Sequence, residues 1–371
     1  MAVIRHISIQ NFRAVRQAEW CPGPSLNCLI GPGDSGKSTI IDAIDLVLGA
    51  RRSFTFSDAD FHLMNTATPI CISITLGQLD DGLLNLEAYG RYFRGFNIET
   101  KEIHDEPLAG DETVLTLRMV VEDDLEPDWL FFSERTTAEG LEKRLQWKHR
   151  EQLSPTRLGA ASHHHLAWGN RSVLNKLSDE DFNVSATLAE LSRQTRQSFA
   201  ARELPQLDAI LTEVRTIANS LGVPVGELKA LLDVNGVSLS NSAISLHNND
   251  NTPLRMLGTG STRLLVSGLQ KAVGRPGTIL IDEAEYGLEP YRISQLLHQL
   301  GSRDPEPTSQ VFITTHSPYV LRELQATQLC VLRKVNQPAP EPSHLFLTLS
   351  GEDQEQATLR ACAEAFFSKA V

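Results

Sequence analysis

This sequence of 371 residues is poor in paired cysteines, long apolar runs and positive charge. Its five cysteines form no CxxC pair, which argues against a structural zinc site and against a disulfide framework. No apolar run approaches the roughly 18 residues that cross a bilayer, and the opening "MAVIRHISIQNFRAV" lacks the apolar core of a signal peptide. The net charge of −12 argues against a basic body that coats nucleic acid. We therefore expect a cytoplasmic protein in a reducing compartment, without membrane association.

The rest of the composition is that of an ordinary globular protein. Hydrophobic residues make up 41% of the chain and charged residues 22%, so neither disorder nor a fibrous structure is indicated. A chain of this length can bury a large core and is expected to form more than one lobe. Short motifs, rather than composition, must therefore carry the functional information.

A phosphate-binding loop is predicted near the N-terminus, in "LNCLIGPGDSGKSTIIDAIDLVLG". An apolar strand over residues 26–30 leads into the pattern GxxxxGK[ST], and a helix follows from Lys37. Glycine lets backbone N–H groups approach phosphates, Lys37 can reach the β and γ phosphates, and the Ser38 hydroxyl can ligate Mg²⁺. The predicted nucleotide-binding residues of this loop are Gly31, Gly33, Asp34, Ser35, Gly36, Lys37, Ser38 and Thr39.

Two acidic residues follow a second predicted strand in "GTILIDEAEYGLEP". The apolar run over residues 278–281 is typical of a buried parallel strand, and ligands bind at the C-terminal ends of such strands. Asp282 can hold Mg²⁺ through water, and Glu283 can orient the attacking water or accept its proton. Two carboxylates after a strand could also be merely solvated, but their place downstream of the phosphate loop favours a metal ligand and a catalytic base.

A histidine follows a third apolar strand in "VFITTHSP". Taken alone, His316 could be a capped core residue, whereas as the third element in this order it can hydrogen-bond the γ phosphate or the attacking water. The predicted catalytic residues are thus Lys37, Glu283 and His316, and the predicted metal ligands are Ser38 and Asp282.

A second glycine-rich stretch, "LGTGSTRLL", precedes an apolar helical run. The order of phosphate loop, long insertion, glycine-rich loop, Asp-Glu strand and His strand resembles the ABC-type ATPases, whose signature loop occupies this place. In that family two protomers pack head to tail, and the signature of each caps the ATP that the other holds. The resemblance implies that Gly258, Gly260, Ser261 and Arg263 contact the partner's nucleotide at a helix N-terminus. The loop is not LSGGQ, which places the chain outside the transporters.

The N-terminal stretch "HISIQNFRAV" is similar to the opening of the SMC, RecF and overcoming-lysogenization-defect (OLD) ATPases. In those families the Asn-Phe-Arg motif lies on an antiparallel strand near the nucleotide, which implies nucleotide binding by Asn11 and Arg13. The stretches "LGTGSTRLL", "LIDEAEYGLEP" and "FSDADFH" resemble the OLD group most. The resemblance covers about residues 1–75 and 235–335.

The expected fold is α/β: an ABC-type P-loop ATPase with an antiparallel β lobe and a helical insertion. We expect four segments, namely 1–75 with the phosphate loop, 76–160 as the antiparallel β-rich part, 161–235 as a helical insertion for dimerisation, and 236–371 with the signature, the acidic pair, His316 and a terminal helix. No heptad run is long enough for an SMC arm.

The resemblance implies a Mg-ATP-dependent dimerising ATPase of the OLD type, with ATP and Mg²⁺ as cofactors. Its ATP hydrolysis would gate a nuclease or other effector, in bacterial or phage genome defence. Long OLD proteins continue into a TOPRIM nuclease domain, whose chemistry needs clustered carboxylates. No such cluster is expected in this sequence beyond the acidic pair, so no nuclease activity is expected from this chain alone; the nuclease would act in trans or follow the C-terminal end.

A RecF-like DNA-repair ATPase, which binds DNA without cutting it, is the alternative function. Both readings predict a head-to-tail homodimer, with a higher assembly possible, and DNA as a possible partner. The absence of a long arm and the OLD-like signature favour the first function. A salt-dependent DNA affinity of the ATP-bound dimer in the absence of other proteins would favour the second.

Overall fold

The computed structural model describes residues 2–51, 54–159, 162–167, 172–177, 190–195, 197–198, 212, 246–250, 252–272, 277–304, 307–335, 341–349, 363 and 367. Its contacts divide the chain into one unit of Met1–Ser162 with Leu257–Val371 and a second unit of His163–Met256. The expected helical insertion over residues 161–235 and the expected terminal helix lie largely outside the described residues and stay predictions. In the described part, no helix is both long enough and apolar enough to cross a bilayer.

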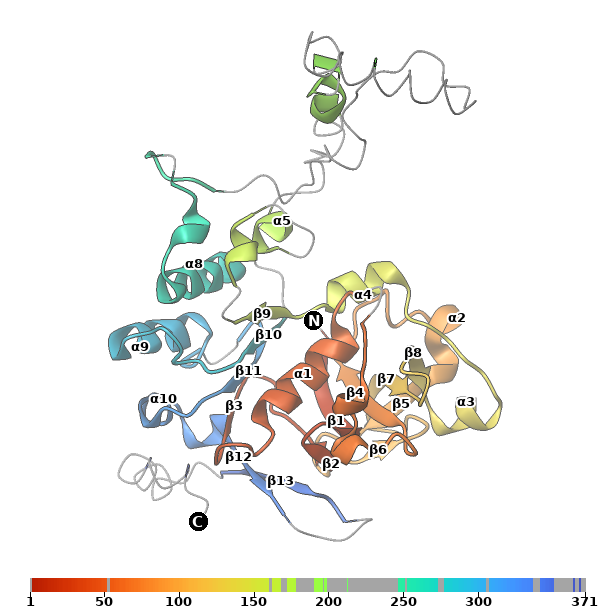
Figure 1. The fold of residues 1–371 in the computed structure, drawn as a ribbon. Helices are drawn as coiled ribbons and strands as arrows, with labels where there is room; N and C mark the ends of the chain where they lie inside the picture. The colour runs from red at the N-terminus through yellow and green to blue at the C-terminus, as the bar shows by residue number, and fades with distance from the viewer. Residues whose placement is uncertain are drawn as a thin grey trace. The chain divides into compact units, whose positions relative to one another are not determined.

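A mainly parallel sheet forms one layer of the first unit (Figure 1). Its strands follow the order β13 (His344–Thr348), β12 (Leu329–Lys334), β3 (Leu26–Ile30), β11 (Gln310–Thr314), β10 (Thr278–Ile281) and β9 (Thr156–Leu158). All neighbours are parallel except the edge pair β12 and β13. Every residue of β3, β10 and β11 is buried, as expected for short apolar strands that are covered on both faces.

An antiparallel sheet forms the second layer. Its main path runs β2 (Val15–Trp20), β1 (Val3–Phe12), β4 (Ile70–Gly77), β7 (Glu112–Val121), β5 (Phe93–Phe96) and β6 (Ile103–His104), and β8 (Pro127–Phe132) also pairs with β7. The sheet therefore begins well before the expected boundary at residue 76, and β9, from the segment expected to be antiparallel, joins the parallel sheet instead. Local alternation of apolar residues predicts a strand but not its partner, which is why the segments and the sheets divide differently.

One helix, α1 (Lys37–Leu48), lies between the two sheets and contacts β10 and β11 on one side and β4 and β7 on the other. Its residues Ile40, Ile41 and Ile44 are fully buried, because both sides of the helix are covered. Helices α8 (Thr259–Ala272), α9 (Pro290–Gln299) and α10 (Pro318–Glu323) lie on the other face of the parallel sheet (Figure 1). The expected fold class is confirmed.

The shorter elements lie between these strands and helices along the chain, and two of them, α5 and η6, belong to the second unit. The described helices of this kind are α2 (Leu86–Tyr89), α3 (Glu134–Ala138), α4 (Trp147–Leu153), α5 (Val173–Leu177), and the 3₁₀ turns η1 (Asp58–Asp60), η2 (His62–Met64), η3 (Gly90–Tyr92), η4 (Ser162–Leu166), η6 (Leu254–Met256) and η7 (Ala326–Gln328). In the second unit, His247 and Pro253 form an isolated antiparallel bridge.

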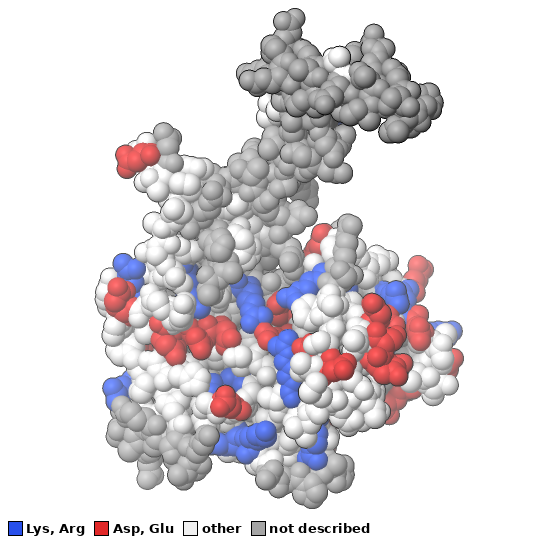
Figure 2. Space-filling model, in the orientation of Figure 1, with Lys and Arg blue, Asp and Glu red and all other residues white. Residues whose placement is uncertain are grey.

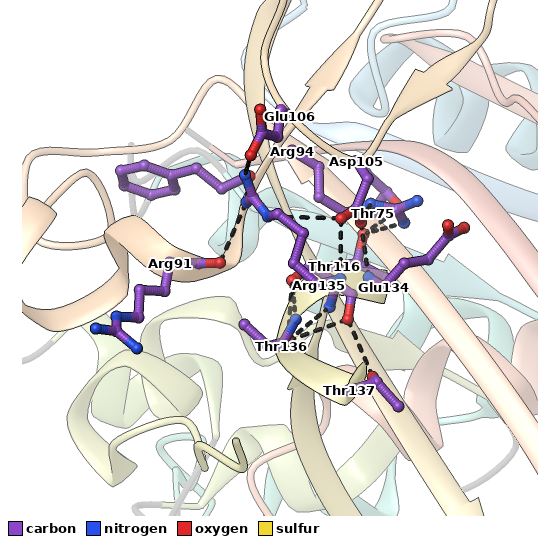
Figure 3. A network of polar contacts seen from close by, with 12 residues as sticks. Thr75, Arg91, Arg94, Asp105, Glu106, Thr116, Glu134, Arg135, Thr136 and Thr137 are labelled. Carbon is purple, nitrogen blue, oxygen red and sulfur yellow. Dashed lines mark hydrogen bonds and ion pairs between the residues drawn. The ribbon is translucent and has the colours of Figure 1, made fainter. Parts of the chain in front are cut away.

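Helix α3 is fastened to the antiparallel sheet by Asp105, at the centre of the polar network in Figure 3. The Asp105 carboxylate accepts hydrogen bonds from the backbone N–H groups of Glu134 at 2.7 Å and Arg135 at 3.0 Å. These N–H groups lie in the first turn of the helix, where the helix itself provides no acceptor for them. It also forms an ion pair with Arg94, whose side chain is only 10% exposed. Burial lowers the pKa of Arg94, and the Asp105 charge opposes that shift.

We expect Asp105→Ala to lower the free energy of unfolding by about 2 to 3 kcal/mol, because it removes the acceptor of two helix N–H groups and the counter-ion of a buried guanidinium. Glu106→Ala is the matched control: Glu106 pairs with Arg135 at 2.8 Å, but its side chain is 69% exposed. The control should cost less than about 1 kcal/mol. Urea unfolding measures both values, and equal losses would contradict the role of Asp105.

Candidate nucleotide-binding site

The phosphate loop connects β3 to α1, as the sequence predicts. Gly31 has a backbone φ of 152° and Gly36 one of 90°, and residues other than glycine rarely adopt positive φ angles. A Cβ at Gly31 would also lie 2.4 Å from the carbonyl oxygen of Leu332, so the backbone passes too closely for a side chain. A Cβ at Gly33 would meet open space, and this glycine is not required by packing within the chain.

Lys37 points back into the loop that precedes it. Its residue surface is 5% exposed, and its Nζ donates hydrogen bonds to the carbonyl oxygens of Gly31 at 3.0 Å and Pro32 at 2.8 Å and to Ser35 Oγ at 3.3 Å. Burial lowers the pKa of Lys37, whereas the nearby carboxylate of Asp282 raises it. The loop thus holds a partly desolvated ammonium within reach of its own oxygens, an arrangement that also suits phosphate oxygens.

The structure brings the two predicted metal ligands into contact. Ser38 Oγ donates a hydrogen bond to Asp282 Oδ1 at 3.0 Å, although 244 positions separate the two residues. Thr314 Oγ1 donates to the same carboxylate oxygen at 2.5 Å. A hydroxyl and a carboxylate beside a phosphate loop form the oxygen donor set that Mg²⁺ prefers, so these residues fit the expected metal.

The second predicted acid, Glu283, is exposed and has a left-handed backbone with φ of 50°. Its backbone N–H donates to Thr314 Oγ1 at 2.8 Å. Thr314 therefore contacts both acidic residues, one through the side chain and one through the backbone. Sequence reasoning missed this threonine, since only its place at the end of the buried strand β11 marks it.

His316 is exposed and follows β11 after Thr315. Both residues are tied to Glu285: its carboxylate accepts hydrogen bonds from the His316 backbone N–H at 2.7 Å and from Thr315 Oγ1 at 2.6 Å. The ring centroid of His316 lies 6.2 Å from that of Phe367. Glu285 was not predicted as a site residue, because an acid three positions after Asp282 has no motif of its own.

Asn11 and Arg13 are engaged with other parts of the chain. The Asn11 amide donates to the carbonyl oxygens of Thr68 at 2.5 Å and Asn65 at 3.0 Å. The Arg13 guanidinium pairs with Asp60 at 2.8 Å and with Asp42, on α1, at 2.5 Å. These contacts join the end of β1 to the helix that follows the phosphate loop. Their predicted contacts with nucleotide stay predictions.

The predicted signature residues lie at the start of α8. Gly258 is exposed and a Cβ there would meet open space, whereas Gly260 is buried and a Cβ there would lie 2.3 Å from the carbonyl oxygen of Gly287. Ser261 Oγ accepts a hydrogen bond from Arg292 at 3.1 Å. Helices α8 and α1 lie on opposite faces of the parallel sheet (Figure 1). Of these residues, Gly258 is the one with free space around it.

The structure places Arg263 differently from the expectation. The residue is 2% exposed, and its guanidinium donates hydrogen bonds to the carbonyl oxygens of Glu283 at 2.7 Å, Asp282 at 3.0 Å and Tyr286 at 3.2 Å. A buried guanidinium with these acceptors does not present its charge at the surface of the chain. The expected contact of Arg263 with a partner's phosphate is therefore corrected: this arginine faces the loop that follows β10.

His344, on β13, packs behind the phosphate loop and was not predicted. It is 1% exposed, its Nδ1 lies 2.8 Å from Ser343 Oγ, and its Nε2 is buried with no hydrogen-bond partner among the described residues. A Cβ at Gly36 would lie 3.4 Å from this nitrogen. Burial, helped by the charge of Lys334, lowers the pKa of His344 to about 4. The imidazole is therefore neutral at pH 7.

Comparison with known proteins agrees with this geometry. Residues 26–322 match the family described as "AAA domain, putative AbiEii toxin, Type IV TA system", and the chain belongs to this family. A curated relative, the OLD nuclease of Thermus scotoductus, is 23% identical over 336 residues, which span 85% of this chain and 59% of the relative. The chain thus spans little more than half the length of that relative. The chain is an OLD-like ABC-type ATPase domain, as the motifs predict.

Solved structures of SMC heads are also similar. A SMC head bound to the C-terminal winged-helix domain of ScpA is 13% identical, with a TM-score of 0.47 and coverage of 94% of this chain and 98% of that chain. The SMC head domain from Thermotoga maritima is 14% identical, with a TM-score of 0.41 and coverage of 93% and 99%.

The His344 environment predicts a specific dependence of stability on pH. The unfolded chain binds a proton on this histidine near pH 6.5, whereas the folded chain binds it only near pH 4. Between pH 6.5 and pH 4 the unfolded chain binds a proton on His344 that the folded chain does not bind. The free energy of unfolding is therefore unaffected by this group above pH 6.5 and decreases by about 3 kcal/mol as the pH falls from 6.5 to 4. Urea unfolding across this range should show a shallower pH slope for His344→Gln than for the wild type. Identical slopes would contradict the buried neutral imidazole.

Proposed function

We propose that this chain is a Mg-ATP-dependent ATPase of the OLD type, which acts as a head-to-tail homodimer and whose ATP hydrolysis gates a nuclease or other effector. The contact between Ser38 and Asp282 carries the proposal, because it joins the phosphate loop to the acidic strand end at a site suited to Mg²⁺. An exposed carboxylate, Glu283, follows directly.

Each residue has a separate role in the proposed reaction. Lys37 would neutralise the β and γ phosphates, and the neighbouring Ser38 and Asp282 would hold Mg²⁺, whose charge would polarise the phosphates when it is bound. Glu283 orients the attacking water and accepts its proton, for which an exposed carboxylate on a fixed backbone is suited. His316, whose backbone is held by Glu285, hydrogen-bonds the γ phosphate.

The surface around Gly258 supports the proposed dimer. This glycine is exposed with open space beside it, at the N-terminal end of the helix α8, where backbone N–H groups favour an anion. Apolar side chains are exposed in the same part of the first unit: Leu257 is 40% exposed, Tyr286 50% and Tyr291 59%. Exposed aromatic and aliphatic side chains around a polar loop are typical of a protein interface.

The effector is proposed from the family. The curated relative is named a nuclease and is longer than this chain, which suggests that its nuclease activity depends on residues outside the matched part. We propose that a TOPRIM-type nuclease or another effector receives the ATP-driven change, either as a separate partner or as a further part of the protein, in anti-phage defence. DNA is the expected substrate of that effector, and this chain alone is not expected to cut it.

We expect Glu283→Gln to slow ATP hydrolysis by roughly 100-fold or more while ATP binding is kept, because the amide cannot accept the proton. Asp282→Ala should instead weaken binding of Mg-ATP. Glu289→Gln is the matched control, since Glu289 belongs to the same loop, is exposed and, in the described part of the chain, forms its ion pair with Arg292. Phosphate release and nucleotide binding are measured for each variant. A wild-type rate for Glu283→Gln would refute its role as the base.

The head-to-tail arrangement predicts complementation between two inactive variants. Gly258→Asp places a carboxylate in open space, where it repels a partner's phosphate without disturbing its own chain. Gly260 is unsuited to this test, since a side chain there collides with Gly287. Gly258→Asp should bind ATP but not hydrolyse it, and an equal mixture with Lys37→Ala should recover about a quarter of the wild-type rate, from one working site in half of the dimers.

Gly268→Asp serves as the control for that experiment, because it adds the same charge within α8 at a position where a Cβ would lie 3.9 Å from the Gln299 side chain. It should retain wild-type turnover by itself. Absence of recovery in the mixture, with mixed dimers shown to form by differently tagged subunits, would refute the arrangement in trans.

A further inference from the structure

The buried guanidinium of Arg263 lies beneath the loop that carries the proposed catalytic base. We propose that Arg263 is a positioning residue for Glu283: it holds the backbone of residues 282–286 so that the Glu283 carboxylate is presented in one orientation. The inference rests on the proposed function of Glu283 as the base. It also links the first turns of α8 to the acidic loop within a single chain.

The geometry shows several donors converging on one short segment. Arg263 Nη1 donates to the carbonyl oxygens of Glu283 at 2.7 Å and Tyr286 at 3.2 Å, and its Nη2 donates to that of Asp282 at 3.0 Å. The guanidinium lies 5.5 Å from the centre of the Tyr286 ring. A planar fork of donors can satisfy several carbonyls at once, whereas the ammonium of lysine is a point charge with a different geometry.

The segment that Arg263 holds is strained. Glu283 has φ of 50°, in the left-handed region, which is unfavourable for a residue other than glycine. Such a conformation persists only where the surrounding contacts enforce it. The short bond from Arg263 to the carbonyl oxygen of Glu283 acts on the strained residue itself.

The opposite side of the loop is held by β11. The N–H of Glu283 donates to Thr314 Oγ1 at 2.8 Å, and the N–H of Ala284 donates to the Thr314 carbonyl oxygen at 3.0 Å. The Glu283 backbone is therefore hydrogen-bonded on both sides, by Arg263 at its carbonyl oxygen and by Thr314 at its N–H group. The carboxylate of Glu283 is exposed, while the backbone that carries it is fixed at both polar groups.

Charge gives Arg263 a second effect on the same loop. Burial lowers the pKa of Arg263, and the carboxylates of Glu285, Glu283 and Asp282 raise it. The arginine is thus a buried cation beneath three acids, and its charge reduces their mutual repulsion.

The N-terminal turn of α8 packs against the end of the same loop. A Cβ at Gly260 would lie 2.3 Å from the Gly287 carbonyl oxygen and 3.0 Å from the Leu288 side chain. Three positions further along α8, Arg263 reaches residues 282–286. The helix that bears the proposed signature and the loop that bears the proposed base are therefore one packed unit.

The test uses the full chain with Arg263→Met, which removes both the donors and the charge, and Arg263→Lys, which keeps the charge. Both should lower kcat by roughly 10- to 100-fold with the affinity for ATP within about twofold of wild type, because only the base is misplaced. Arg94→Met is the control for losing a buried guanidinium, since Arg94 is 8% exposed and belongs to the antiparallel sheet; its kcat should be unchanged.

A double variant separates positioning from general support of the fold. If Arg263 acts through Glu283, then Arg263→Lys combined with Glu283→Gln should be no slower than Glu283→Gln alone, since the base it positions is already absent. Thermal unfolding confirms that each variant compared is folded. Multiplicative losses in the double variant, or loss of ATP affinity in both single variants, would overturn the positioning role and leave the proposed function standing. A wild-type rate for Glu283→Gln would overturn the proposed function itself.

Discussion

The parallel pairing of three buried strands is the constraint on which the rest of the site depends. β3 pairs with β11 and β11 with β10, so that Leu29 lies opposite Thr314 and Ile313 lies opposite Ile281. Parallel strands in register end at one edge of the sheet, and the three loops that follow them meet there. The hydrogen bond from Ser38 to Asp282 is a direct consequence of this register.

Polar side chains then fix the loops that the strands bring together. Thr314 contacts both acids, Glu285 holds the backbone after β11, and Arg263 holds the backbone after β10. Thr314 and Arg263 are buried and Glu285 is partly buried, and away from solvent a hydrogen bond is strong and an unpaired polar group is costly. The residues proposed for chemistry, Glu283 and His316, are exposed on a backbone that these partners immobilise. Such preorganisation is what transition-state stabilisation requires.

The residues of the proposed signature do not share one environment. Gly258 is open to the outside, whereas Gly260 is buried against Gly287 and Arg263 lies beneath the acidic loop. A motif whose residues were expected to share one role in trans is thus divided between an exposed position and an internal one. A partner that binds at Gly258 would act on a helix already packed against the loop of Glu283, which offers a route from dimerisation to the proposed gating.

The sequence alone determined the elements that depend on local patterns. The apolar runs of β3, β10 and β11, the glycines at positions 31 and 36, and the order of the motifs follow from strand burial, backbone freedom and spacing. Only the tertiary structure decided which strands share a sheet, that Arg263 is internal, and that Thr314, Glu285 and His344 belong to the site. The reason is physical: a side chain's partners are set by packing between segments that lie tens to hundreds of residues apart, and no local pattern records them.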